Sequence, residues 1–233
     1  DVPAYKVYEV SKHGNIYSSL GHGWNFDPVP WSIGKDITAP TCATCHMSLV
    51  TAGGEVVAKR THQMNDRLPW RIFGPIYAHP HPKSADTTVI RNRAGLSLPT
   101  DFNGQPAASY LIDRPEQDKR LKTLQQVCLS CHSRSWVEGH FQRLDHTIQT
   151  TNQMTLAATD IMQVAWDRGL ARGLSQKASP FDEAVEKKWM EQWLFYANST
   201  RFASAMMGAD YGVFADGRYQ LNKAVMDLHD WLE

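Results

Sequence analysis

The four cysteines of this 233-residue chain fall into two copies of one pattern, Cys-x-x-Cys-His. The first copy spans residues 42–46, and the second lies 86 residues later, at residues 128–132. Two thiols at this spacing can add to the two vinyl groups of a haem, and the adjacent histidine can bind the iron from one face. The pattern is the attachment signature of haem c, so the sequence predicts two covalently bound haems c.

The predicted attachment residues are four cysteines and two iron-binding histidines: Cys42, Cys45, His46, Cys128, Cys131 and His132. Zinc ribbons also use pairs of cysteines, but their pairs usually lie roughly 15–20 residues apart, and zinc gives no reason for a histidine after each pair. A redox-active dithiol usually lies near a βαβ pattern, which is not evident in this sequence. Both alternatives therefore fit the spacing less well than haem c.

A second axial ligand is expected for each low-spin iron, often from a distant histidine or methionine. His13 precedes Gly14, a residue that would let a flat ring approach the backbone closely. His62 follows the first motif by 16 residues, and His140 follows His132 by eight. The predicted distal ligands are therefore His13, His62 and His140.

Five other histidines are further candidates: His22, His79, His81, His146 and His229. His79 and His81 alternate with Pro80 and Pro82, so they could bind iron or simply belong to a stiff, extended loop. A histidine alone on a surface is more often a hydrogen-bonding residue than a ligand. We therefore expect few of these five to bind iron.

Composition and charge limit the remaining functions. The chain is 42% hydrophobic and 21% charged, with 24 basic and 24 acidic residues, so it resembles a soluble globular protein and offers no excess of basic charge for nucleic acid. No apolar stretch reaches the length of about 18 residues that a membrane span requires. Because haem c is attached outside the cytoplasm, we expect a periplasmic or extracellular protein. The absence of a signal peptide predicts a mature form or a fragment of something longer.

The distribution of proline divides the chain. Of its 12 prolines, 11 lie at or before Pro115. This predicts a loop-rich haem-binding region at residues 1–115, with the first motif, and a helical region at residues 116–233, with the second motif. The expected fold class is mainly α: an irregular, haem-packed first half followed by long C-terminal helices.

Periodicity predicts three of those helices. The first ends near Gly169 and buries residues spaced by three or four: Phe141, Leu144, Ile148, Thr151, Thr155, Ala158, Met162 and Trp166. The second should begin at Ser179 and Pro180, a favourable cap and first turn. The third should follow a turn at Asp216 and Gly217 and run close to the C-terminus.

Several runs in this sequence resemble the octahaem hydroxylamine oxidoreductase (HAO) family, and more distantly the multihaem nitrite reductases. The resemblance covers nearly the whole chain but only the C-terminal half of such a protein. The matching segments are residues 12–17, 39–47, 61–62, 128–133 with Trp136, and 205–211.

The resemblance implies a mostly helical fold in which His13 is the distal ligand of the haem held by His132. It also implies that His62 reaches a haem attached earlier in the family's chain. No motif for that haem is present here, so another polypeptide supplies it or His62 has a different role. The family's inter-subunit tyrosine cross-link falls in the region of Tyr211, for which packing is the alternative.

Three departures from the family bear on function. The family's catalytic haem is missing, and Val2 stands where relatives have an active-site histidine. Relatives also have a histidine in a C-terminal helix that ligates the haem of the first motif, whereas residues 193–198 contain none. His140 is the expected substitute; the alternative is an open iron in a site lined by Phe195, Tyr196 and Met206.

Electron transfer through two haems, without catalytic residues in this chain, is therefore the expected function. One alternative is a part of an HAO-like enzyme acting on hydroxylamine, hydrazine or nitrite. Another is a subunit of an extracellular cytochrome assembly. The expected partners are other haem-bearing chains or redox proteins, in an oligomer that could supply further haems.

Overall fold

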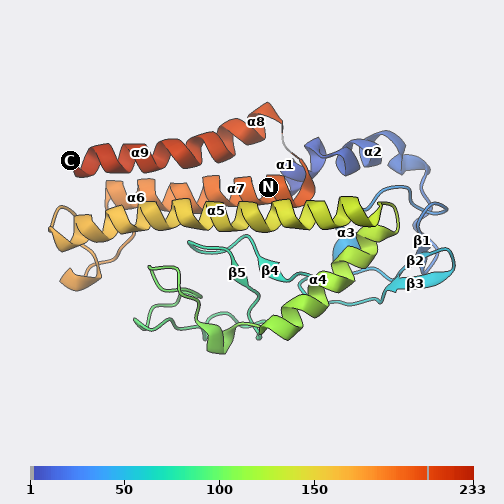
Figure 1. Ribbon diagram of the computed structural model, residues 1–233, viewed down its shortest axis with the longest axis horizontal. Helices are drawn as coiled ribbons and strands as arrows, with labels where there is room; N and C mark the ends of the chain where they lie inside the picture. Colours follow the sequence, from blue (N-terminus) through green and yellow to red (C-terminus); the bar gives the residue numbers. More distant parts are fainter. Residues whose placement is uncertain (1–2, 209) are drawn as a thin grey trace.

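Long helices running side by side dominate the protein (Figure 1). The computed structural model describes residues 3–208 and 210–233, and about 54% of the chain is helical, which confirms the mainly α class. The residue Val2, expected at the place of an active-site histidine, lies outside the described residues. In chain order the elements are α1 (Pro3–Val10), α2 (Lys12–Leu20), η1 (Gly21–Gly23), β1 (Trp31–Ser32), α3 (Cys42–His46), β2 (Val50–Ala52), β3 (Glu55–Ala58), β4 (Trp70–Arg71), β5 (His79–Pro80), η2 (Ala108–Tyr110), α4 (Arg114–Leu129), α5 (Arg134–Asp167), η3 (Leu174–Gln176), α6 (Ala184–Glu191), η4 (Gln192–Ala197), α7 (Asn198–Met206), α8 (Tyr211–Phe214), η5 (Ala215–Tyr219) and α9 (Gln220–Leu232).

Helix α5 is the axis of the molecule. It runs for 34 residues, begins where the Ser133 side chain accepts a hydrogen bond from Trp136 N, and packs against α7 and α9 (Figure 1). The apolar stripe predicted for it is largely the buried face. Its buried residues are Val137, His140, Ile148, Thr151, Thr155, Ala158, Thr159, Met162, Ala165 and Trp166. Within residues 3–208 and 210–233, α5 included, no helix is long and apolar enough to cross a membrane.

Three tryptophans, Trp166, Trp189 and Trp193, form the centre of the main core. Trp166 Nε1 donates to the buried carboxylate of Glu186 at 2.8 Å, and that carboxylate also accepts from two backbone N–H groups before α6, each at 2.8 Å. Glu186 therefore helps to fix the start of α6 at Ala184 as part of a capping box. The prediction that this helix begins at Ser179 and Pro180 was wrong by several residues.

The turn predicted at Asp216 and Gly217 is also wrong, because α8, η5 and α9 follow one another as continuous helix. Gly217 is buried there against the neighbouring helix. A Cβ atom on it would lie 3.3 Å from Thr200 Oγ1 and 3.4 Å from Thr200 N. The glycine therefore permits close approach of η5 to α7 rather than a reversal of the chain.

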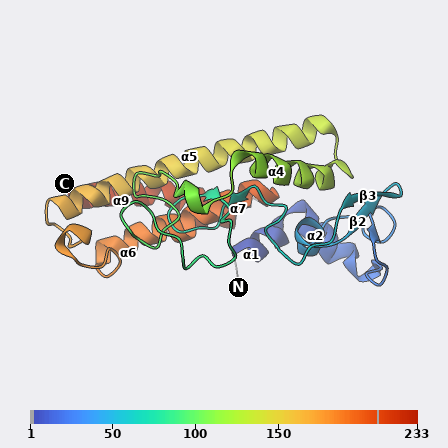
Figure 2. The same cartoon turned by 90° about the horizontal axis from the view of Figure 1, so that it is seen from below.

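The first half contains the short helices and strands expected of a proline-rich chain. Strand β2 pairs in parallel with β1 and antiparallel with β3, while β4 and β5 form a separate antiparallel pair. Seen from below, the loops between β4 and α4 lie over the layer of long helices (Figure 2), where Ile76 and Tyr77 enter the main core. These loops are thus part of the fold rather than an appendage.

Two glycines allow other parts of the chain to pack closely against the backbone of α1. A Cβ on Gly14 would lie 1.9 Å from Tyr8 O, and one on Gly208 would lie 2.1 Å from Val7 O. Gly14 thus serves the contact between α1 and α2, a role other than the close approach of a flat ring predicted from the sequence.

Candidate haem-binding site

The first Cys-x-x-Cys-His motif forms the single-turn helix α3. Thr41 caps its start, and the hydroxyl of the fully buried Thr44 accepts a hydrogen bond from Thr41 N at 3.1 Å. At the other end the buried guanidinium of Arg67 donates to Thr44 O at 2.8 Å, Ser48 O at 2.5 Å and Lys59 O at 2.6 Å. Arg67 thereby satisfies one carbonyl of the short helix and two carbonyls of the chain after it. Hydrogen bonds at both ends of α3 thus fix the local structure around the two thiols.

His46 is held by the ring nitrogen that haem ligation does not use. Its Nδ1 lies 2.9 Å from Met64 O, and because a carbonyl can only accept, Nδ1 carries the proton. This leaves the lone pair of Nε2 available for a metal. A hydrogen bond from Nδ1 to a backbone carbonyl is a common outer-shell partner of a metal-binding histidine. The arrangement at His46 therefore fits an iron ligand.

The second motif occupies the corner between the two helices α4 and α5. Cys128 belongs to the last turn of α4, His132 N donates to Cys128 O at 2.9 Å, and Ser133 then caps α5. Below the corner, Val127 packs in a small cluster with Val50 and Ala58 of the first half. The corner is therefore anchored to the strands that follow the first motif.

The two motifs lie close together. Burial and the neighbouring thiols of Cys128 and Cys42 raise the pKa of Cys45 to about 12, and burial raises the pKa of Cys128 to about 11. In the part of the chain that the structure describes, however, no three side chains of His, Cys, Asp or Glu gather to form a metal site. The thiols of the two motifs are thus neighbours in the fold.

His13 and His132 are far apart in the sequence but are brought together in the fold. Their ring centroids lie 6.1 Å apart, with planes inclined by 47°. Two imidazoles bound to one metal through bonds of about 2.0–2.1 Å would have centroids separated by about 6 Å. Ser11, which caps α2 by accepting from Gly14 N at 3.1 Å, fixes the helix turn that carries His13. The observed separation fits a pair of axial ligands.

His140 lies beyond the second motif on α5. The ring of Trp136 stacks on His132 at a centroid distance of 3.9 Å and on His140 at 5.3 Å. His140 is buried, its Nδ1 has no hydrogen-bond partner, and burial followed by the nearby Arg143 lowers its pKa. These contacts place His140 beside Trp136 and His132. None of them is a contact with His46, for which His140 was the expected second ligand.

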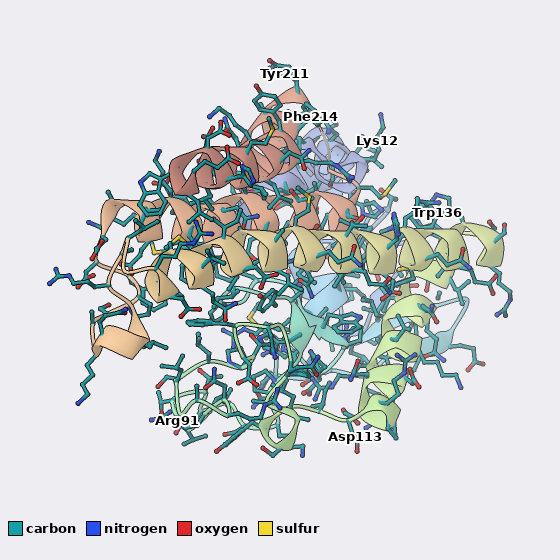
Figure 3. The ribbon with its side chains drawn as sticks, turned by 60° about the vertical axis from the view of Figure 1, so that its left-hand side comes forward. Lys12, Arg91, Asp113, Trp136, Tyr211 and Phe214 are labelled. Atoms are coloured by element: carbon teal, nitrogen blue, oxygen red, sulfur yellow. The ribbon has the colours of Figure 1, made fainter. Side chains whose placement is uncertain are left out.

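The other predicted positions lie at the surface. His62 is exposed in the loop after β3, near the segment that holds His46. Phe195, expected beside an open iron, is half exposed on η4. Tyr211 is 85% exposed and projects outward next to Phe214 (Figure 3). Phe195 and Tyr211 are therefore largely open to solvent, while His62 lies close in sequence to Met64, the partner of His46.

A second group of buried basic residues includes His79 and His81, which the sequence offered only as further candidate ligands. His79 and His81 are only 2% and 4% exposed, and burial lowers the pKa of each to about 4. The fully buried guanidinium of Arg201 binds Asn152 Oδ1 at 2.7 Å, yet its Nε is unpaired, and burial lowers its pKa to about 9. The alternation of histidine with proline was the sequence signal; the burial of these rings could not be read from it.

Comparison with known proteins agrees with the motifs. A family model described as "Seven times multi-haem cytochrome CxxCH" matches residues 1–73. A solved structure called "Hypothetical multiheme protein" is 36% identical with a TM-score of 0.88, and the match covers 100% of this chain and 52% of that one. A Kuenenia stuttgartiensis reducing HAO-like protein complex is 15% identical with a TM-score of 0.69, covering 97% and 51%. No curated protein sequence matches.

The chain thus spans about half the length of the two solved structures. Both similarities extend over nearly the whole of this chain, and the family model includes the first motif, its cap and His62. The free Nε2 of His46 and the spacing of His13 from His132 fit haem c. The chain therefore carries a multihaem cytochrome CxxCH segment at residues 1–73, and its fold is similar to that of a multihaem protein and of a reducing HAO-like protein complex.

Proposed function

We propose that this chain transfers electrons through two haems c bound at its two motifs. His46 and His132 would be the proximal ligands, and His13 the distal ligand at the second motif. When bound, each haem supplies a one-electron couple whose potential depends on its axial ligands and surroundings. The observation that carries the proposal is the 6.1 Å separation of His13 and His132, which suits an iron with both axial positions filled.

The protein's own contribution is to orient ligands and to bring the two attachment points together. Met64 orients His46, Ser133 and Trp136 support His132, and the thiols of Cys45 and Cys128 are neighbours. Adjacent attachment points favour transfer between the two haems over substrate binding at either. We infer a periplasmic or extracellular location, because haem c is attached outside the cytoplasm.

Intact mass combined with spectroscopy tests the proposal. The mass should exceed that of the polypeptide by two haems, and reduction should show two low-spin haems that neither bind cyanide nor turn over hydroxylamine or nitrite. Rapid ligand binding followed by turnover with an artificial electron acceptor would instead establish an enzyme.

A second candidate is a role as one part of a larger HAO-like assembly. It is favoured by the length of the solved relatives and by the description of one of them as a complex. The exposed aromatic side chains of Tyr211 and Phe214 would suit contact with another haem-bearing chain (Figure 3). Eight haems per assembled particle, measured by native mass and haem content, would support this candidate; a free particle with two haems would contradict it.

A further inference from the structure

The proximal histidine of the second motif lies against an aromatic side chain. Trp136, at the start of α5 (Figure 3), stacks its indole on the ring of His132, with centroids 3.9 Å apart and planes inclined by only 14°. We propose that Trp136 is a positioning residue, which holds the plane of the His132 ring at a fixed angle to the plane of the His13 ring. This angle would set the electronic state of a haem bound by the two histidines. The inference rests on the proposed binding of haem at the second motif.

The two proximal histidines are held in different ways. His46 is oriented by the hydrogen bond from its Nδ1 to Met64 O at 2.9 Å. Within residues 3–208 and 210–233, by contrast, no other residue forms a hydrogen bond to a ring nitrogen of His132. A hydrogen bond of this kind normally fixes the orientation of a metal-binding imidazole, so a ring without it can turn about its bond to the metal unless packing prevents the rotation. At His132 the stacked indole is the contact that restricts this rotation.

Trp136 is itself held in place. Residues 132, 136 and 140 follow one another in steps of four, so Trp136 lies between His132 and His140, and its ring stacks on His140 at 5.3 Å with planes inclined by 8°. His140 is only 6% exposed and anchors the stack in the interior. Main-chain N–H groups are also fixed, because His132 N donates to Cys128 O at 2.9 Å and Trp136 N donates to Ser133 Oγ at 3.3 Å. The His132 ring thus leans on a ring that is restrained from its other side.

The stack leaves the ligand position of His132 free. A histidine binds a metal through a ring nitrogen, in the plane of the ring, whereas Trp136 covers a face of that ring. The centroids of His13 and His132 are 6.1 Å apart, which is too close for a third ring to lie between them at a stacking distance of 3.9 Å on each side. Trp136 therefore stands beside the pair of axial ligands and not in the gap between them.

The angle between the two axial rings matters for the iron. The planes of His13 and His132 are inclined by 47°. An imidazole interacts with the iron d orbitals that extend perpendicular to its plane, so two parallel imidazoles separate the energies of these orbitals and two perpendicular ones leave them nearly equal. The angle therefore determines the anisotropy of the g values of a ferric low-spin haem. Outer-shell residues that orient the ligands tune the metal in this way.

Electron paramagnetic resonance of the holoproteins of Trp136→Leu and Trp136→Phe tests the proposal. In Trp136→Leu we expect two covalent haems by intact mass, both low spin. The largest g value of one haem should shift and its signal should broaden, because the His132 ring would then take up a range of angles. Trp136→Phe keeps an aromatic face against His132 and should retain the wild-type signal. Trp231→Leu, at a partly exposed tryptophan of α9, is the control and should leave both signals unchanged.

The signal that shifts in Trp136→Leu should be the one that His13→Ala removes from the low-spin spectrum. Two wild-type signals in Trp136→Leu, or a shift confined to the other haem, would overturn the proposal. If Trp136→Leu does not fold, the wild-type protein decides the question, because haem-methyl shifts in paramagnetic nuclear magnetic resonance report the planes of the axial rings. Inclined rings at the second motif would support the proposal, and parallel rings would contradict it. Failure of the proposed function is separately visible, since the wild-type protein would then lack two low-spin haems before any substitution.

Discussion

The ring centroids of His13 and His132 lie 6.1 Å apart, although the two residues come from α2 and from the corner between α4 and α5. The contact joins the first turn of α2 to the start of the longest helix. Lys12 and Trp136, the neighbours of the two histidines along these elements, lie at the same end of the molecule (Figure 3). A single bridging metal would therefore connect the two halves of the sequence.

The first prediction concerns this pair. His13→Ala should convert one haem from low spin to high spin, because the His132 iron would lose its second imidazole. Electron paramagnetic resonance and the electronic spectrum would measure the change. His22→Ala, at an exposed histidine of η1, is the control and should leave the spectrum unaltered. Two unchanged low-spin haems in His13→Ala would refute the pairing.

The second prediction is that the two attachment sites are separable. Removing both thiols of one motif, as in Cys42→Ala with Cys45→Ala, should lower the intact mass by one haem, because no thioether bond can then form there. Cys128→Ala with Cys131→Ala should have the same effect at the other motif. Denatured gels stained for haem would show about half the intensity in each case. Retention of both haems by either double variant would rule out that motif as an attachment site.

The third prediction concerns Arg67, whose buried guanidinium bonds carbonyl groups around α3. Arg67→Met should lower the free energy of unfolding by about 3 kcal/mol or more, because hydrogen bonds to a charged group contribute about 1.5–3 kcal/mol each and buried carbonyls would lose their partners. Denaturant titration followed by circular dichroism would measure it. Arg60→Met, at an exposed position, should change stability by less than about 0.5 kcal/mol. Equal effects of the two substitutions would count against the proposed role.

The fourth prediction concerns Glu186, which accepts hydrogen bonds from Trp166 Nε1 and from two backbone N–H groups. Glu186→Ala should cost about 2–4 kcal/mol of stability, since it removes a helix cap and leaves a buried indole N–H unpaired. Tryptophan emission should also shift, because Trp166 loses its partner. Glu191→Ala, exposed in the same helix, is the control. An unaffected denaturation midpoint in Glu186→Ala would show that the cap is dispensable.

The fifth prediction separates glycines by the space around them. Gly208→Ala should destabilise the protein by about 1–3 kcal/mol or more, because its Cβ would lie 2.1 Å from Val7 O and α1 would have to move. Gly23→Ala should be tolerated, since an added Cβ there meets no atom within 4 Å. Thermal unfolding of both variants measures the difference. If both variants unfolded at the wild-type temperature, the packing of α1 described above would be incorrect.

Local patterns were sufficient to predict the attachment motifs and the largest helix. The cysteine spacing is dictated by haem chemistry, and the stripe from Ile148 to Trp166 is dictated by the helical period, so both can be recognised without tertiary information. The mainly α class followed from the same periodicity. The helical content confirms the mainly α class, while the attachment residues stay a prediction.

Features that depend on distant contacts could not be predicted in this way. Ser179 and Pro180 form a good local helix start, yet α6 begins at Ala184. Glu186 caps it there, and the same carboxylate accepts a hydrogen bond from Trp166 of α5. The local sequence at Gly217 predicts a turn, but in the fold the glycine lies within a helix and allows close packing against Thr200. Likewise, the burial of His81 depends on β4 and α4, which approach it only in the folded chain.

The position of the second motif at the corner of α4 and α5 has a consequence for maturation. The two longest helices, α4 and α5, end and begin at Leu129 and Arg134, so the residues between them set the angle at which the helices meet. Thioether bonds at Cys128 and Cys131, together with ligation by His132, would immobilise that connection from three points within five residues. Attachment of the cofactor would then fix the angle between the helices, and the polypeptide would reach its final shape only after that step.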